Sequence, residues 1–330
     1  MIPIILASDE NYFVPLYVTL KSLFSNTKEN IHIKILIDKA FSIEKTELLT
    51  RLASQYDNIV EFYDMSYVNN RLKTTIPHIT IATYYRLWAT EVFKEYNKCI
   101  YLDVDIVVTG DIKNLYEINI GDNYIAGVKA TLFHLHKNGY KSHCAMLGIK
   151  DINQYINAGV MVMNLEQIRN NKIDILFHTL ISKQFTVQDQ DIINASCYNH
   201  IRLLHPKFNL MITQDIGREE MYKVFGNQQT DEAFSTPIII HYAGRVKPWK
   251  SPLVKFSEEW WRVAMTFENW QAVWMTMCKN IEFEFMQCKK SAEYKIGSIF
   301  TILPKRICSI MNAVKYLGIQ GLIYKLREKI

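Results

Sequence analysis

Hydrophobic and polar positions alternate along the first hundred residues in a way that predicts strands and helices in turn. Residues 2–7 form an apolar, β-branched run that ends in a polar segment, which is typical of a buried strand followed by a loop. The apolar positions after it recur at helical spacing. In chain order, we expect a strand at 2–7, a helix at 12–25, a strand at 31–37, a helix at 42–55 with Ser42 as its N-cap, a strand at 60–63, a helix at 83–93 and a strand at 99–108.

This alternation predicts an α/β fold in which a mainly parallel sheet is flanked by helices. Ligands of such sheets bind beyond the carboxyl ends of the strands, so polar motifs at strand ends carry the most weight. The first strand is not followed by G-x-G-x-x-G, and G-x-x-x-x-G-K-[ST] does not occur. Neither dinucleotide nor P-loop binding is therefore indicated.

The composition changes after Pro252, where a Pro-containing loop gives way to a segment rich in tryptophan and methionine that we expect to be helical. We therefore predict one domain at 1–255 and a helical C-terminal region at 256–330. The net charge of +5 is modest, and residues 289–330 alone carry nine basic and two acidic side chains. The basicity belongs to this tail, and the balance of charge elsewhere argues against a general nucleic-acid binder.

Compartment signals in the sequence favour a cytoplasmic protein. No stretch approaches the ~18 apolar residues that a membrane-spanning helix needs. The N-terminus has no basic start before its apolar run, unlike a secretory signal. The six cysteines form no C-x-x-C pair, so we expect reduced structural thiols.

Two carboxylates interrupt the apolar segment 98–108. Residues two apart in a strand share a face, so Asp103 and Asp105 would project together. Like charges in apolar surroundings need a proton, a counter-charge or a bound cation. A divalent metal explains the pair most simply, and the alternative is that the pair only marks the exposed end of a strand.

A second apolar run, 237–241, ends in His241. Imidazole with two carboxylates suits manganese, and magnesium is also possible. Close by, Gly244 permits close backbone approach, and Lys247 offers an ammonium group for phosphate oxygens. A lone histidine at a strand end is also commonly a structural residue.

Six motifs follow one another along roughly residues 1–255. They are Ala7-Ser-Asp-Glu-Asn-Tyr12, His78-Ile-Thr with Thr83-Tyr-Tyr-Arg-Leu87, Tyr101-Leu-Asp-Val-Asp105, Asn157-Ala-Gly-Val-Met-Val-Met-Asn-Leu165, Gln188-Asp-Gln-Asp-Ile192 and His241-Tyr-Ala-Gly-Arg-Val-Lys-Pro-Trp249. In this order they resemble glycosyltransferase family 8, and most of all its lipopolysaccharide and lipooligosaccharide galactosyltransferases and glucosyltransferases. Any one motif alone would be weak.

The resemblance implies a GT-A fold and a manganese-dependent transferase that moves galactose or glucose from a UDP-sugar with retention of anomeric configuration. It implies that Asp103, Asp105 and His241 bind the metal against the UDP diphosphate. The other positions that match donor contacts in the family are Ala7, Asp9, Asn11, Tyr12, Arg86, Val104, Asn157, Ala158, Asp189, Gln190, Gly244 and Lys247.

Catalytic roles would fall to Asp189 and Gln190 by the same resemblance. Their run of acids and amides could instead be a solvated helix start, where acids are favoured. No carboxylate pair with the ~5 Å separation of retaining glycosidases is identifiable, and an amide is a poor nucleophile. Front-side displacement is therefore favoured. His78 and Thr83 match the acceptor side.

The tail at 289–330 mixes basic, aromatic and aliphatic residues, a composition that suits an anionic membrane surface. We expect peripheral attachment to the inner face of the cytoplasmic membrane, near a lipid-linked acceptor; a basic helix packed on the body is the alternative.

Two other functions stay open. A sugar-nucleotide nucleotidyltransferase would carry a Gly-rich basic loop at 8–12, which is missing, and an inactive sugar-binding module would not need all three metal ligands.

Overall fold

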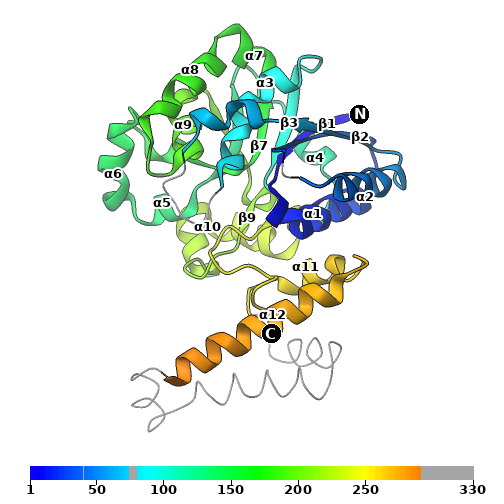
Figure 1. Ribbon diagram of the computed structural model, residues 1–330. Helices are drawn as coiled ribbons and strands as arrows, with labels where there is room; N and C mark the ends of the chain where they lie inside the picture. Colours follow the sequence, from blue (N-terminus) through cyan, green and yellow to red (C-terminus); the bar gives the residue numbers. More distant parts are fainter. Residues whose placement is uncertain (40, 74–79, 291–330) are drawn as a thin grey trace. The chain divides into compact units, whose positions relative to one another are not determined.

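The computed structural model describes residues 1–39, 41–73 and 80–290. The chain forms two compact units, Met1–Arg245 and Val246–Ile330, and each is considered by itself (Figure 1). The division falls before the boundary that the sequence suggests. The functional limits 1–255 and 256–330 stay a prediction.

A seven-stranded sheet is the framework of the first unit, with strand order β3-β2-β1-β4-β7-β6-β8. Only β7 runs antiparallel to its neighbours β4 and β6, and the other neighbouring pairs are parallel. The expected mainly parallel sheet is thus confirmed, and the start of β7 lies at the carboxyl end of β4. The strands are β1 Ile2–Ala7, β2 Ile31–Ile37, β3 Ile59–Asp64, β4 Lys98–Leu102, β6 Ile125–Lys129, β7 Ile156–Asn164 and β8 Ile201–Leu203.

A second, three-stranded sheet was not expected from the sequence. Its order is β5-β10-β9, with β5 Ile106–Val108, β9 Leu210–Met211 and β10 Ile239–His241. β10 pairs antiparallel with β5 and parallel with β9. The predicted strand that ends in His241 is therefore confirmed, in a small sheet of its own.

The prediction of one continuous strand over 99–108 is wrong, because the chain bends between β4 and β5. The amide of Asp103 still donates to the carbonyl of Gly159 at 2.7 Å, as in the large sheet. The Thr19 hydroxyl then donates to the carbonyls of Val104 and Ile106, at 2.9 and 3.1 Å. This buried hydroxyl stabilises the bend, after which the chain joins the other sheet.

Helices cover both faces of the large sheet (Figure 1). One face carries α1 Phe13–Asn26 and α2 Ile43–Ser54, the latter capped by the predicted Ser42. The other face carries the 3-10 helix η3 Ile81–Trp88 and helices α3 Ala89–Val92, α7 Leu165–Asn170, α8 Ile173–Leu180 and α9 Gln188–Ser196. The expected α-helix at 83–93 is therefore mostly 3-10 helix. The remaining elements of this unit are α4 Lys113–Tyr116, α5 Thr131–Leu135, α6 Lys137–Met146, α10 Arg218–Ser235 and the 3-10 turns η1 Glu10–Tyr12, η2 Ser66–Arg71, η4 Ile152–Gln154, η5 Ile181–Lys183 and η6 Pro206–Phe208.

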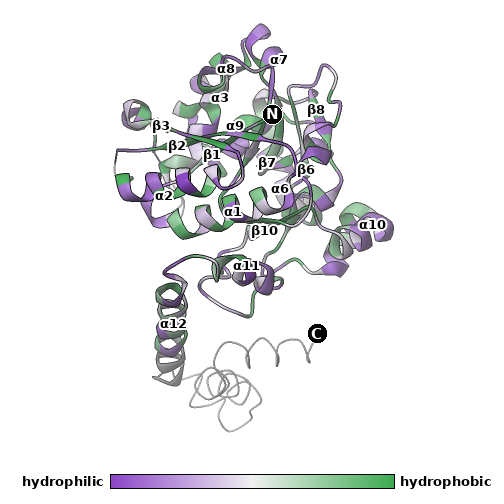
Figure 2. Ribbon diagram, turned by 90° about the vertical axis from the view of Figure 1, so that its right-hand side faces the viewer, coloured by the Kyte–Doolittle hydropathy of each residue, from purple (hydrophilic) through white to green (hydrophobic). Residues whose placement is uncertain are grey.

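The core lies between the sheet and these helices. Ile5, Cys99, Tyr101 and Met161 belong to one buried cluster with η3 and α7–α9, as period-2 alternation requires. Figure 2 shows hydrophobic and hydrophilic residues alternating along the helices that surround the sheet. The buried strands β1 and β4 pair in parallel, so their carboxyl ends lie at the same edge of the sheet.

Tryptophans form the core of the second unit. Trp260 packs against Trp249 and Trp261, with ring centroids 5.3 and 5.0 Å apart, and Trp261 packs against Trp274 at 5.0 Å. This unit contains the expected helices, α11 Ser257–Ala264 and α12 Trp270–Lys290. Among the described residues, none of the helices combines the length and hydrophobicity of a membrane span. The predicted membrane-associating tail lies outside the described residues from 291 onward.

Candidate active site

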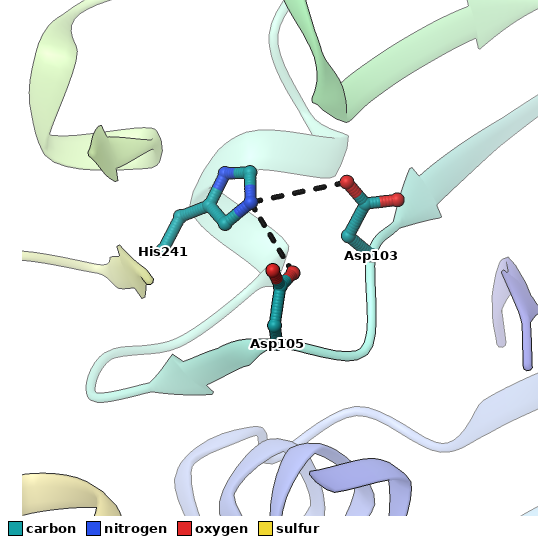
Figure 3. Close-up of side chains that lie close together, drawn as sticks. All are labelled: Asp103, Asp105 and His241. Carbon is teal, nitrogen blue, oxygen red and sulfur yellow. Dashed lines mark ion pairs between the residues drawn. The ribbon is translucent and has the colours of Figure 1, made fainter. Parts of the chain in front are cut away.

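Asp103, Asp105 and His241 converge at the carboxyl edge of the large sheet (Figure 3). The two aspartates lie in the bend between β4 and β5, and His241 ends β10. His241 Nε2 is 3.8 Å from Asp103 Oδ2 and 3.2 Å from Asp105 Oδ1. The predicted trio is therefore assembled, although the carboxylates meet because of a bend and not because they share a strand face.

The donor set fits a divalent cation. Ligand atoms of all three residues lie within 4.8 Å of one another. Around an octahedral ion at about 2.1 Å, neighbouring ligands are separated by roughly 3 Å and opposite ones by roughly 4 Å, so little adjustment is needed. His241 Nδ1 hydrogen-bonds Asn209 Oδ1 at 2.9 Å. Because this contact engages Nδ1, it leaves Nε2 facing the carboxylates.

Gly159 leaves no space to spare beside this cluster. A Cβ atom at this position would lie 2.3 Å from His241 Cε1 and 2.6 Å from Asp103 Oδ2. Both distances are well inside van der Waals contact. Only a glycine lets β7 approach two of the three candidate ligands so closely.

Arg86 holds the Asp103 carboxylate from the side opposite His241. Its Nη2 donates to Asp103 Oδ1 at 2.8 Å, and its Nε is 3.0 Å from Asp189 Oδ2. Its Nη1 also donates to the carbonyl of Ala158 at 2.6 Å, and the guanidinium lies over the Tyr101 ring at 4.2 Å. Burial opposes the charge, but Asp103 and then Asp189 outweigh it and raise the pKa of Arg86 above its ordinary value.

Asp189 is a buried carboxyl held by two partners. Besides the ion pair with Arg86, its Oδ1 accepts a hydrogen bond from the Thr83 hydroxyl at 2.9 Å. Burial raises the pKa of Asp189 to about 6, although Arg86 and Thr83 act in the opposite direction. The alternative of a solvated helix start at 188–191 is wrong, because Gln188, Asp189 and Asp191 are all buried.

Gln190 lies against the first residues of β7. Its Oε1 accepts from the amide of Ala158 and from Asn157 Nδ2, both at 3.2 Å. Its Nε2 donates to the Tyr155 hydroxyl at 3.2 Å, which in turn donates to Asp191 Oδ1 at 2.6 Å. The candidate residues Asn157, Ala158 and Gln190 are thus brought together, and Arg86 links them to the carboxylate cluster.

The loop after β1 brings a second group of predicted residues to the same edge. Ala7 is buried at the strand end, and Asp9 caps the turn η1 by accepting from the amides of Asn11 and Tyr12, at 2.8 and 3.2 Å. Burial, and then the negative charges of Asp105, Asp9 and Asp103, raise the pKa of Tyr12 to about 12. These charges act on Tyr12 because its half-buried ring lies near them. Val104 is buried in the bend between the two aspartates.

Four further predicted positions have different outcomes. Gly244 is packed against the segment before it, where a Cβ atom would lie 3.0 Å from Thr213 Cα, and its amide donates to the carbonyl of Ile212. Its close approach is therefore to the chain itself. Lys247 lies in the second unit, and its role toward a donor stays a prediction. Thr83 is at the site, bonded to Asp189, whereas His78 lies outside the described residues.

Several residues of the site were not predicted. Gly159 stands inside a motif that the sequence presents, so its position was available, but its steric role was not. Tyr101 donates to Asp103 Oδ1 at 3.0 Å, and Asn209 contacts His241. Asn209 lies in a segment without a recognisable motif, and no sequence signal marks it.

Ligand sites at the carboxyl ends of strands in α/β sheets are typical of nucleotide-binding enzymes. Comparison with known proteins makes the class specific. The profile of glycosyl transferase family 8 matches residues 3–252. The chain belongs to this family, so it is a glycosyltransferase, and the resemblance read from its motifs is confirmed.

Named relatives include two enzymes of lipopolysaccharide synthesis. The lipopolysaccharide 1,2-glucosyltransferase of Escherichia coli is 27% identical over 329 residues, which cover 95% of this chain and 89% of the relative. The lipopolysaccharide 1,3-galactosyltransferase of Salmonella typhimurium is 26% identical over 250 residues, 74% of this chain and 71% of the relative. The chain is therefore related to lipopolysaccharide hexosyltransferases.

Solved structures support the fold. The galactosyltransferase LgtC, solved with donor and acceptor sugar analogues, matches with a TM-score of 0.70 and 24% identity over 82% of this chain and 100% of its own. The bifunctional glycosyltransferase WbbM matches with a TM-score of 0.73 and 22% identity over 83% of this chain, which spans about half (51%) of WbbM. The fold of the described first unit is thus GT-A like.

Proposed function

We propose that this protein transfers galactose or glucose from a UDP-sugar, with retention of anomeric configuration, to a lipopolysaccharide or lipooligosaccharide core. The transfer depends on manganese, for which magnesium can substitute. The observation that carries the proposal is the convergence of Asp103, Asp105 and His241 next to the buried Arg86–Asp189 pair, in a chain of family 8. The names of its lipopolysaccharide relatives support the acceptor class.

The site divides into a metal, a nucleotide and a sugar region. Asp103, Asp105 and His241 would hold the cation, which when bound neutralises charge on the leaving UDP. The residues of the first unit proposed for uracil, ribose and diphosphate are Ala7, Asp9, Asn11, Tyr12, Val104 and Gly244. Lys247, which belongs to the second unit, is proposed as a diphosphate contact from the family motif alone. The residues proposed around the donor hexose are Arg86, Asn157, Ala158, Asp189 and Gln190.

Directional hydrogen bonds suit recognition of a neutral sugar by this last group. Arg86 and Asp189 are more than nine-tenths buried, so their orientation is set by the fold before any donor binds. Thr83 borders them and is proposed, with His78, to contact the acceptor. A site whose polar groups are fixed in advance spends little free energy on reorganisation.

Front-side displacement is the proposed mechanism. The anomeric carbon loses its bond to the UDP oxygen and gains one to the acceptor hydroxyl oxygen on the same face, while the hydroxyl proton passes to the leaving phosphate. The hydrogen bonds of Gln190 support this. Because its Oε1 already accepts from Ala158 and Asn157, the oxygen has no unused lone pair with which to attack.

The place of action is also part of the proposal. A lipid-linked oligosaccharide is presented at a membrane, so we propose a peripheral protein on the inner face of the cytoplasmic membrane, attached through the basic aromatic tail at 289–330. Vesicles with and without anionic lipid test this directly. The full chain should sediment with anionic vesicles only.

The alternatives are less well supported. A nucleotidyltransferase needs a Gly-rich basic loop after the first strand, and the turn at 8–12 contains neither glycine nor a basic residue. An inactive sugar-binding module would have no use for the carboxylate pair and its arginine.

Release of UDP from a panel of UDP-sugars, with and without manganese, tests the proposed function. We expect one UDP-hexose to be hydrolysed slowly without acceptor, only with the metal, and not by Asp103→Ala or Asp105→Ala. Asp231→Ala, which alters an exposed carboxylate on α10, is the matched control and should behave as the unaltered protein. The proposal would be contradicted if both aspartate variants hydrolysed the UDP-hexose as fast as the unaltered protein, or if the unaltered protein hydrolysed no UDP-sugar.

A further inference from the structure

Asn209 contacts both the candidate cation site and the proposed sugar region, although no sequence motif marks it. It lies in the loop between η6 and β9 and is fully buried. Its Oδ1 is 2.9 Å from His241 Nδ1, and its Nδ2 donates to Asn157 Oδ1 at 2.9 Å. One side chain thus joins a candidate cation ligand to a residue of the proposed sugar region.

The direction of these hydrogen bonds follows from groups that can only donate. The backbone amide of Gly159 donates to Asn157 Oδ1 at 3.0 Å, which fixes that atom as the oxygen. The Asn209 atom that faces it must therefore be the NH₂ group, because two carbonyl oxygens would repel. Asn209 Oδ1 then faces His241, so His241 Nδ1 carries the proton.

The tautomer of His241 has a consequence for the cation site. When the ring is neutral, a proton on Nδ1 leaves the lone pair on Nε2, which faces Asp103 and Asp105. Three acceptors then point at one another, an arrangement that a bound cation stabilises. The orientation of the Asn209 amide therefore keeps His241 in the form that binds a metal.

The same chain of hydrogen bonds continues to Gln190 and ends at the buried carboxyl group of Asp191. Asn157 Nδ2 donates to Gln190 Oε1, whose orientation the Ala158 amide fixes independently. Gln190 Nε2 donates to Tyr155, and Tyr155 donates to Asp191. Every bond from His241 to Asp191 runs in one direction, and Asp191 Oδ1 also contacts His143 Nε2 at 2.8 Å.

We propose that Asn209 is a positioning residue that couples the cation site to the amide pair Asn157 and Gln190, and that its two atoms perform separable tasks. The inference rests on the proposed function, since it concerns the metal and the donor sugar of that reaction. Asn209 Oδ1 sets the tautomer of His241 and so the metal affinity. Asn209 Nδ2 sets Asn157 and, through it, Gln190, and so the rate of sugar transfer.

Two substitutions separate these tasks. Asn209→Asp keeps an oxygen for the His241 Nδ1 proton but places an acceptor against Asn157 Oδ1. Asn209→Ala removes both bonds. The matched control is Asn58→Asp, because Asn58 is another buried asparagine, whose Oδ1 accepts from the Ile31 amide at the amino edge of the sheet. A carboxylate there keeps the acceptor and contacts no part of the site.

The experiment measures, for each full-length protein, the manganese concentration that half-saturates UDP binding and the kcat of UDP-hexose hydrolysis at saturating manganese. Thermal denaturation confirms folding. For Asn209→Ala we expect the half-saturating concentration to rise about 10- to 100-fold, as when a metal ligand loses the side chain that hydrogen-bonds and orients it, with a lower kcat. For Asn209→Asp we expect it to stay within about threefold of the unaltered protein while kcat falls by tenfold or more, on the order of other such losses. Asn58→Asp should change neither.

Clear results would overturn the inference. If Asn209→Asp raises the half-saturating manganese concentration as much as Asn209→Ala does, Asn209 has no separate task toward His241. The same holds if Asn209→Ala leaves that concentration unchanged. If Asn209→Ala does not fold, Asn209→Asp decides alone, and an unchanged kcat refutes the coupling. Failure of the proposed function looks different: the unaltered protein itself would bind UDP independently of manganese and hydrolyse no UDP-hexose.

Discussion

Gly159 offers a sharp test of the site, because a single methyl group would reach two candidate metal ligands at once. In Gly159→Ala the new Cβ atom would lie 2.3 Å from His241 Cε1 and 2.6 Å from Asp103 Oδ2. Ordinary contacts of this kind are about 3.5 Å, so the ring must move by about 1 Å and the carboxylate by somewhat less. Neither group can move freely, since Asn209 holds His241 and Arg86 holds Asp103.

The magnitude follows from these constraints. Overpacking a buried position costs about 1–3 kcal/mol. If the strain displaces the ligands, a free energy of this size is lost from metal binding, and the metal affinity falls by about 10- to 100-fold. We therefore expect Gly159→Ala to lower the free energy of unfolding and to raise the manganese concentration needed for UDP binding.

A second glycine provides the control. In Gly110→Ala the Cβ atom would lie 2.5 Å from Ile238 Cδ1, the end of a partly exposed side chain that can rotate away. The two variants are compared by urea denaturation and by UDP titration at graded manganese concentrations. Gly110→Ala should retain the manganese dependence of the unaltered protein. A Gly159→Ala variant with that same dependence would refute the steric reasoning.

Two further predictions concern the charges beside the cluster. Arg86→Ala leaves Asp103 and Asp189 without their buried counter-charge and should lower the free energy of unfolding by about 3–5 kcal/mol in urea denaturation. The control Arg51→Ala removes an exposed ion pair and should change this free energy by less than about 1 kcal/mol. Similar losses in the two variants would contradict this expectation. Because burial raises the pKa of Asp189 to about 6, the folded state binds the proton more tightly than the unfolded state between about pH 4 and 6, and this carboxyl makes the free energy of unfolding fall by about 3 kcal/mol as the pH rises through that window. Asp189→Asn should remove this part of the pH dependence, and identical slopes for the two proteins would show that the pKa of Asp189 is not raised.

The elements of the first half of the sheet could be predicted because their residues obey a local rule. Residues 2–7 are an apolar run, residues 31–37 begin with alternating apolar and polar positions, and both are strands of the structure. The Ser42 cap was equally local. Periodicity and capping depend on near neighbours in the sequence, so the sequence alone contains them.

The bend at 103–105 could not be predicted from the same rules. It depends on the Thr19 hydroxyl, which comes from α1, and on the pairing of β5 with β10, which is more than a hundred residues away in sequence. The second small sheet was missed for the same reason. Long-range pairing leaves no periodic trace in the segment that bends.

The residues of the site likewise divide into those that a local motif marks and those whose role depends on distant contacts. Carboxylates and a histidine at strand ends pointed to the three candidate metal ligands, and the motifs pointed to Arg86 and Gln190. Asn209 was missed because its role depends on contacts with two distant residues. Asp189 was proposed only through its motif, since its acidic surroundings in sequence suggested solvent exposure, and the structure buries it.

The proposed metal site is tested most directly by a crystal of the full chain grown with UDP and manganese, in which anomalous scattering locates the metal. We predict a manganese peak coordinated by Asp103, Asp105 and His241 Nε2 and by the UDP diphosphate. UDP bound beside these residues with manganese elsewhere, or with no manganese peak at all, would show that Asp103, Asp105 and His241 do not bind the metal.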